Sequence, residues 1–312
     1  MKIITILIFG VILFVSCSDN IDREPRLKDI QNDWDRDNLF GHVKTLSQFK
    51  ANVTDFENIL TEKPILEFKK EYSDFGKIVY QEYFDNFGKL EQFTKNSYND
   101  KTQRIKSINE NLLMQSKSTD ISKYDSTGRL ILAKAIFNDT LHFSASFEYD
   151  SIGNIIKSTS IQNNDTSYGI NKYTYNEKGK VLSKIEFDTD GNKYSSNYKY
   201  NENNEIIESV DKSELFGEMK MTYHYDEQNR IKTITHFKNK KIEEERNFDK
   251  HLNPVSIKYY ENSKLYRELK NEYSFDNYGN WIEKKVFMKQ HFAKQKKFMP
   301  IYFVTRKIEY YE

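Results

Sequence analysis

The chain has 312 residues, and its charge is high but balanced, with 48 Lys and Arg against 47 Asp and Glu. This balance argues against a dedicated nucleic-acid binder or a polybasic membrane protein, because both need an electrostatic field of one sign. The single cysteine excludes internal disulfides and cysteine-rich metal sites. The length allows one or two domains with a large core.

Residues 1–16 are organised as a signal peptide. Lys2 precedes the apolar run Ile3 to Val15, which is shorter than the ~20 apolar residues that a bilayer-spanning helix needs. The run continues into Leu13-Phe14-Val15-Ser16-Cys17, which resembles the lipobox of bacterial lipoproteins. The resemblance implies cleavage before Cys17 and a lipid on Cys17. The alternative is an ordinary secretory signal in which this cysteine has no role.

Residues 17–40 are predicted to form a flexible acidic tether. Ser18 to Asn38 contains seven acidic residues, four basic residues and few apolar ones. The acidic start, Ser18 to Asp22, resembles the signals that send some Gram-negative lipoproteins to the outer face of the outer membrane; a simple polar spacer is the alternative. We therefore expect a lipid-anchored envelope protein at the outer membrane, on its surface or on its periplasmic face.

Residues 41–312 are predicted to form one β-repeat domain. A short unit recurs in it: an aromatic residue, Asp or Asn, two variable residues, Gly or Asn, and a polar residue, as in Tyr175 to Lys180. Asp or Asn caps the local amides of a type I turn, and Gly or Asn then takes a positive φ to complete a bulged hairpin. The positions predicted to have this role are Gly76, Gly88, Gly128, Gly153, Gly179, Gly191, Asn204, Asn229 and Gly279.

The spacing of these units predicts the architecture. Their aromatic residues fall at 72, 84, 98, 124, 149, 175, 187, 200, 225, 248 and 275, in steps near ~12–13 residues or twice that. One strand and one turn fill the short step, so roughly 18–20 antiparallel strands are expected. A sheet of this length must hide its aromatic face. We expect an all-β meander curled into an open half-barrel or spiral sheet, with a twisted sandwich as the alternative.

Two copies carry a family resemblance. Tyr149 to Ile156 and Phe275 to Ile282 resemble the YD repeats of the RHS family, and the similarity covers roughly residues 66–288. The resemblance implies a long, curling antiparallel sheet. Large members of that family wrap a cargo domain, but this chain is too short to do so and has no obvious C-terminal effector.

No catalytic or metal-binding pattern stands out. The six His residues are far apart, and there is no HExxH, GxSxG, P-loop or GxGxxG sequence. The many Asp residues of the repeats could be read as calcium ligands, but they occupy the turn corner, where Asp has a backbone role. We expect no enzyme activity, no cofactor and no metal; a hydrolase assembled from distant strands stays an alternative.

Two further features could bind a partner. Tyrosine stripes such as Tyr223 and Tyr225 are read as cross-strand core pairs or as a stacking platform. The segment Lys284 to Lys307 holds eight basic residues and no acid; it is read as a lysine-protected edge, or as a surface for anionic headgroups or lipopolysaccharide phosphate. The expected function is a non-catalytic interaction or scaffold module with an envelope protein or glycan as partner. The alternative is a carrier of a hydrophobic ligand in the curled sheet.

Overall fold

The computed structural model describes residues 32–55, 60–215, 217–292 and 297–312. This part of the chain contains one short helix and 21 strands in a single sheet. The elements are α2 (Asp33–Arg36), β1 (Val43–Asp55), β2 (Leu60–Thr61), β3 (Ile65–Tyr72), β4 (Ile78–Phe84), β5 (Leu90–Tyr98), β6 (Arg104–Asn111), β7 (Ser116–Tyr124), β8 (Leu130–Phe137), β9 (Thr140–Tyr149), β10 (Ile155–Gln162), β11 (Asp165–Tyr175), β12 (Val181–Phe187), β13 (Lys193–Tyr200), β14 (Ile206–Ser213), β15 (Gly217–Tyr225), β16 (Ile231–Lys238), β17 (Lys241–Phe248), β18 (Pro254–Glu261), β19 (Lys264–Phe275), β20 (Trp281–Gln290) and β21 (Met299–Tyr310).

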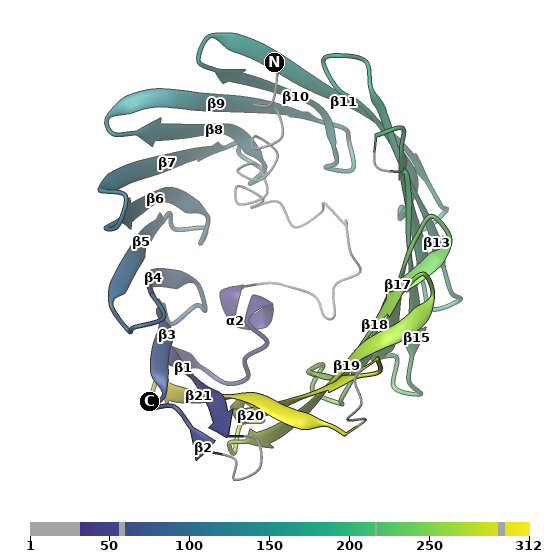
Figure 1. The fold of residues 1–312 in the computed structure, drawn as a ribbon. Helices are drawn as coiled ribbons and strands as arrows, with labels where there is room; N and C mark the ends of the chain where they lie inside the picture. The colour runs from purple at the N-terminus through teal and green to yellow at the C-terminus, as the bar shows by residue number, and fades with distance from the viewer. Residues whose placement is uncertain (1–31, 56–59, 216, 293–296) are drawn as a thin grey trace, which may run out of the picture.

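The sheet closes into a barrel. From β3 to β21 each described strand pairs antiparallel with the next, while β1 pairs with both β3 and β21 and thereby joins the two ends. Among the described strands only β2 lies outside the ring, since it pairs with β1 alone, and the other 20 form the ring. Figure 1 shows the closed ring. The all-β expectation is confirmed, but the open half-barrel or spiral sheet is wrong, and so is the twisted sandwich.

The closing contact is a full strand pairing. Val43 to Asn52 of β1 pair with Tyr310 to Tyr302 of β21. Beyond the strands, the Tyr311 hydroxyl donates to the carbonyl of Tyr72 at 2.5 Å. Closure satisfies the backbone groups of the first and last strands, which would otherwise be two exposed edges. The meander therefore stops curling where its two ends meet.

The repeated corners are bulged hairpin turns that lie mainly at one rim. At the corner after β4, Gly88 N donates to Asp85 O and Asp85 N to Lys89 O, and Gly88 has φ +79°. All nine positions named above as turn residues have positive φ, and so do Thr102 and Leu252 in two degenerate copies. Because successive turns alternate between rims, the copies that begin at residues 84 and 187 lie at the opposite rim from the other nine. Copies on the main rim recur every 23–27 residues, which is two strands and two turns.

The second rim uses a tighter turn. Asn138 and Asp139 both have positive φ, as do Asn163 and Asn164. Two consecutive residues of this kind form a type I′ turn, which fits the twist of the flanking strands. The pairs at 239–240 and 262–263 have the same conformation.

Tyrosine hydroxyls connect successive repeats along the main rim. The Tyr124 hydroxyl donates to the carbonyl of Arg104, and that of Tyr149 to the carbonyl of Leu130. The same contact recurs at Tyr98, Tyr173, Tyr200, Tyr225 and Tyr273. Each hydroxyl reaches the first residue of the strand that follows the preceding corner. Tyr173 and Tyr273 stand two residues before the aromatic position of their copies, so tyrosines at or just before that position bind neighbouring repeats together.

The last part of the predicted tether packs on the barrel. In α2, the backbone amide of Asp33 donates to Gly76 O, and the indole of Trp34 donates to Val43 O at 2.8 Å. Trp34 and Leu39 belong to a buried cluster with Leu46 and other residues of the wall. The predicted signal peptide, Cys17 and the rest of the predicted tether up to residue 31 lie outside the described residues.

Candidate functional site

The contacts of α2 identify the inward face of the wall. Figure 1 places α2 within the ring, and Trp34 packs in one cluster with Leu46, Tyr72 and Ile308. Leu46 is directly opposite Ile308 in the ladder, and opposed residues in an antiparallel sheet share a face. Following the same rule from strand to strand assigns every regular wall position to the inward or the outward face.

A ring of 20 strands is too wide for its own side chains to fill. With strands ~4.8 Å apart and tilted by ~40°, its radius is about 20 Å; barrels of about 16–18 strands already enclose an aqueous channel. Inward side chains accordingly keep solvent contact: Tyr83 is 38% exposed and Met219 is 51% exposed. The inward face is therefore a surface that a ligand can reach.

The outward face is covered by ion pairs. Lys199 lies 2.7 Å from Glu208, and Lys270 lies 2.7 Å from Glu272. These two lysines are 70% and 53% exposed. Further outward pairs are Lys69–Glu71, Lys117–Glu110, Lys157–Glu148, Lys212–Glu218, Lys220–Glu208, Lys258–Glu245 and Lys307–Glu309. This surface suits water, because a lipid-facing barrel presents an apolar band ~25 Å tall.

The inward face combines rings with small polar and charged residues. Ser209 and Tyr223 are buried on it, and their hydroxyls lie 3.4 Å apart. Most inward charges have a partner: Lys184 contacts Glu186 at 2.6 Å, and Arg246 pairs with Glu244. Lys70 contacts Asp37, which follows α2, at 2.7 Å.

Three inward cations around Val304 depart from this pattern, as does Arg267, which faces inward on β19 over the ring of Tyr259. Lys50 of β1 and Lys284 of β20 both pair with Val304 of β21, and Arg306 lies two residues further along β21. Within the described chain, none of the three has a carboxylate within ion-pair distance. Instead, Lys50 Nζ lies 4.6 Å from the ring centre of Tyr302.

The other two cations of this group also lie over rings. Arg306 stacks on Trp281 at 3.5 Å, and Lys284 Nζ is 5.9 Å from the ring centre of Tyr273. Burial, followed by the positive charge of Arg306, lowers the pKa of Lys284. Burial also lowers the pKa of Arg306 to about 10. Arg306 Nη1 is buried without a hydrogen-bond partner among the described residues.

The residues predicted from the repeat are structural and do not converge on one site. Each corner carboxylate or amide binds its own turn: Asp125 Oδ1 accepts from the backbone amides of Thr127 and Arg129, both at 2.9 Å. The hydrogen bond from the Thr127 side chain, followed by those from the backbone and side chain of Arg129, lowers the pKa of Asp125. The corners are distributed around both rims, as the ring requires.

The described residues contain no group of three or more His, Cys, Asp or Glu placed to hold a metal ion. No helix in the described part of the chain combines the length and the apolar character needed to cross a membrane.

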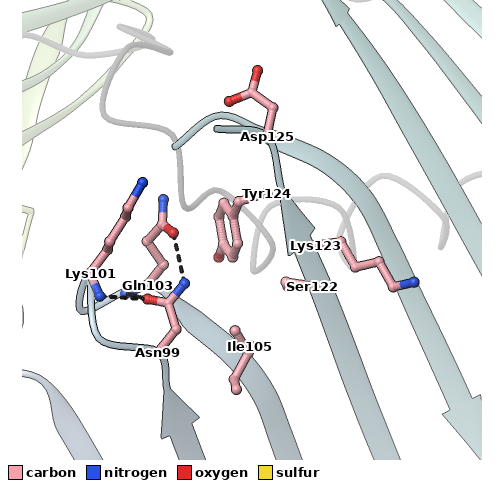
Figure 2. Close-up of a pocket in the computed structure, with 8 residues that line it drawn as sticks. All are labelled: Asn99, Lys101, Gln103, Ile105, Ser122, Lys123, Tyr124 and Asp125. Atoms are coloured by element: carbon pink, nitrogen blue, oxygen red, sulfur yellow. Dashed lines mark hydrogen bonds between the residues drawn. The ribbon is translucent and has the colours of Figure 1, made fainter. Parts of the chain in front are cut away.

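A small pocket lies between two successive corners of the main rim. Figure 2 shows Asn99 and Gln103 of one corner facing Tyr124, the residue before the next corner. Its volume is ≈ 370 Å³. Asn99 Nδ2 donates to Gln103 Oε1 at 2.9 Å, and Gln103 Nε2 donates to Gly128 O at 2.8 Å. Its polar groups thus hold the corners together, and the pocket presents no catalytic constellation.

The basic segment Lys284 to Lys307 is evident in the sequence, but the placement of its residues on the two faces of the wall is not. The segment Lys284 to Lys307 was expected to protect a sheet edge, yet β21 is bonded on both sides, to β20 and β1. The edge interpretation is therefore wrong. Period-two alternation divides the segment, since Lys284 and Arg306 face inward while Lys285 and Lys307 face outward.

Comparison with known proteins gives no named family. A family model described only as "Uncharacterised protein" matches residues 107–195, less than half of the chain. No curated protein matches. The chain is similar to the crystal structure of a porin-like protein from Bacteroides uniformis, with 12% identity, a TM-score of 0.34, and coverage of 86% of this chain and 96% of that chain.

Two further solved structures show comparable likeness. A porin-like protein from Bacteroides vulgatus has 13% identity and a TM-score of 0.29, covering 87% of this chain and 99% of that chain. A crystal structure of TcdB2-TccC3-Cdc42 has 13% identity and a TM-score of 0.38, covering 80% of this chain and 14% of that chain. No function is transferred from likenesses of this size. The identification with the RHS family is wrong, because the matching family model is an uncharacterised one and the sheet closes into a barrel instead of a spiral.

Proposed function

We propose that this protein is a non-catalytic binding barrel of the bacterial envelope, tethered at the outer membrane by a lipid on Cys17. Its wall stands in water and its lumen is the binding surface. The observation that carries the proposal is the contrast between the two faces of the wall. Outside, lysines and glutamates neutralise one another, whereas inside, tyrosines, small polar residues and unpaired cations face a wide lumen.

The outward charges favour a tethered barrel over a membrane-spanning one. A lysine on the lipid face near the bilayer midplane costs about 2–4 kcal/mol. Folded proteins are stable by only ~5–15 kcal/mol, so a few such residues offset the whole free energy of folding. Charged pairs recur around the described ring from Lys69 to Glu309 and interrupt its outward apolar surface. Membrane attachment then depends on the acyl chains, each buried CH₂ contributing ~0.8 kcal/mol.

A hydrophilic ligand suits the lumen better than a hydrophobic one. A carrier of lipid-like molecules needs an inner face of aliphatic residues, but Ser196 and Asp211 are bonded to each other on the inward face at 2.5 Å. Asn109 and Asp120 are bonded there too. Covering these groups with an apolar ligand would cost their solvation.

Membrane fractionation of the full-length protein and a Cys17→Ala variant tests this function. In a Gram-negative host, the wild type should take up labelled palmitate and partition with detergent. The variant should be unlabelled and, once mass spectrometry has shown that its signal peptide is removed, should appear in the aqueous fraction as a folded monomer. Retention of the processed variant in urea-washed membranes, or single-channel currents in planar bilayers, would show that the wall contacts lipid and would refute the proposal.

A further inference from the structure

Lys50, Lys284 and Arg306 form a triangle of positive charge around one wall residue. Val304 is directly opposite Lys50 on one side and Lys284 on the other. Arg306 is opposite Gln48, two positions along the same face, and donates from Nε to Gln48 Oε1 at 3.1 Å. Diagonal neighbours of this kind are ~7–8 Å apart at the backbone, so three long side chains can reach one bound group.

The charges of this triangle are held in place but not neutralised. An aromatic face attracts a cation through its quadrupole and carries no net charge, so stacking on Trp281 and Tyr302 leaves the positive field intact. By contrast, the outward Lys307 of β21 lies 3.3 Å from the carboxylate of Glu309. The inward cations therefore remain available to an anion.

The nearest acids are already engaged. Glu67 accepts a hydrogen bond from Gln48 Nε2 at 2.9 Å. Its negative charge raises the pKa of Lys284, but this effect is smaller than the lowering by burial and by the charge of Arg306. Asp37 accepts from Lys70 Nζ at 2.7 Å and from the Tyr72 hydroxyl at 2.5 Å. The three cations thus face two carboxylates. Glu67 is hydrogen-bonded to Gln48 and Asp37 is paired with Lys70, so the local electrostatic field is positive.

We propose that Lys50, Lys284 and Arg306 form a binding site for one oxyanionic group, a phosphate, sulfate or carboxylate, on a ligand that enters the lumen. The site deepens the proposed luminal function and rests on it. The planar guanidinium of Arg306 suits two oxygens of such a group, and the two ammonium groups act as point charges beside it. Nη1 of Arg306, which has no partner among the described residues, gains one when the anion binds.

Two matched pairs of variants on the same strands test the site. Lys284→Gln and Arg306→Gln each remove an inward charge; Lys285→Gln and Lys307→Gln remove the adjacent outward charge and are the controls. Each protein, prepared as the mature full chain, is titrated with inorganic phosphate by calorimetry at constant ionic strength. We expect the wild type and both controls to bind phosphate alike, and each inward variant to bind at least tenfold more weakly. Far-ultraviolet circular dichroism confirms that each variant is folded.

A second ligand separates the two sources of the anionic group. Glucose 6-phosphate carries the phosphate on a sugar. If the wild type binds glucose 6-phosphate more tightly than inorganic phosphate, the site is assigned to an anionic sugar. If it binds the two equally, the site is assigned to the free ion. The absence of binding by the wild type, or equal weakening in the outward controls, would overturn the site. That failure is distinct from failure of the proposed function, which the fractionation of the Cys17→Ala variant reports without any ligand.

Discussion

Replacing Gly76 by alanine should destabilise the barrel far more than the same replacement at Gly179. Both residues take the Gly position of the corner unit, with φ of +78° and +77°. A Cβ at residue 76 would lie 2.6 Å from Trp34 Cε3, whereas a Cβ at residue 179 would have no heavy atom within 4 Å. The backbone strain is therefore the same at the two positions, and only the collision differs.

The magnitudes follow from these two contributions. A non-glycine residue in the left-handed region costs about 1 kcal/mol, which is the full effect expected for Gly179→Ala. In Gly76→Ala, the indole of Trp34 must also move; it is 8% exposed and bonded to Val43 O. Losing part of the packing of a buried tryptophan adds about 2–3 kcal/mol, below the ~3–5 for its complete removal. We expect a total of about 3–4 kcal/mol.

Thermal and urea unfolding measure the difference. At ~2–4 °C per kcal/mol for a chain of this size, Gly179→Ala should lower Tm by about 2–4 °C and Gly76→Ala by about 6–16 °C. The chain has only two tryptophans, so a Trp281→Phe background reports the surroundings of Trp34 by fluorescence. Equal losses at the two positions would refute the packing of Trp34 on this corner, and no loss at Gly179 would refute the need for glycine in the unit.

Three further outcomes are expected. Lys284→Met should stabilise the ligand-free protein by about 1 kcal/mol at pH 7, since it removes a buried cation without a carboxylate. The pKa of Lys284 is lowered in the fold, so its charge opposes folding fully below the folded pKa. The advantage of the variant should therefore fade as the pH rises from that pKa toward the ordinary value of 10.5, and it should be absent above 10.5. Tyr200→Phe should cost about 1 kcal/mol in urea unfolding, because the 2.7 Å bond to Val181 O is lost; an unchanged midpoint would exclude a role of the hydroxyls in joining repeats. Asp125→Asn should flatten the acid limb of the stability curve, since a carboxyl with a lowered pKa stabilises the fold above its ordinary 3.8 and loses this effect as the pH falls toward its folded value; an acid limb identical to that of the wild type would contradict it.

The corners could be predicted because their chemistry is local. Asp150 and Gly153 lie within one six-residue unit, and the conformation they take depends on the side-chain acceptor and the missing Cβ that the sequence displays. The alternation of the strands between these corners is equally local. A reader of the sequence therefore recovers the hairpins, their direction and nearly all of their number.

Closure could not be predicted from the same units. It depends on whether β1, which begins at Val43, meets β21, which ends at Tyr310, after the twist of all intervening strands has accumulated. No residue of either strand identifies the strand with which it pairs, since a closing strand and an edge strand have similar alternation of polar and apolar residues. The same corners would fit a spiral, which is why the resemblance to YD repeats gave the wrong global shape.

The inward face was also hidden, because neither face of a wide barrel is uniformly apolar. In β12, Val181, Ile185 and Phe187 look like a core face in the sequence. The ladder nevertheless places Lys184 inward, opposite Tyr173. A lumen filled with water imposes no demand for apolar residues, so hydrophobic periodicity identifies two faces without telling which is inside.

The basic segment shows how the candidate site could have been found once closure is known. Counting by twos from Lys284 passes through Val286, which is fully buried, and counting back from Arg306 reaches Val304. On each strand the inward-facing alternate residues include one cation among apolar and aromatic residues. The outward-facing alternate residues include Lys285 and Lys307, which are exposed. A lysine or arginine retained among apolar neighbours is costly unless something compensates its charge, and the described residues around Val304 supply rings but no free carboxylate. The compensation that this arrangement lacks is an anion, and the lumen is the side from which one can arrive.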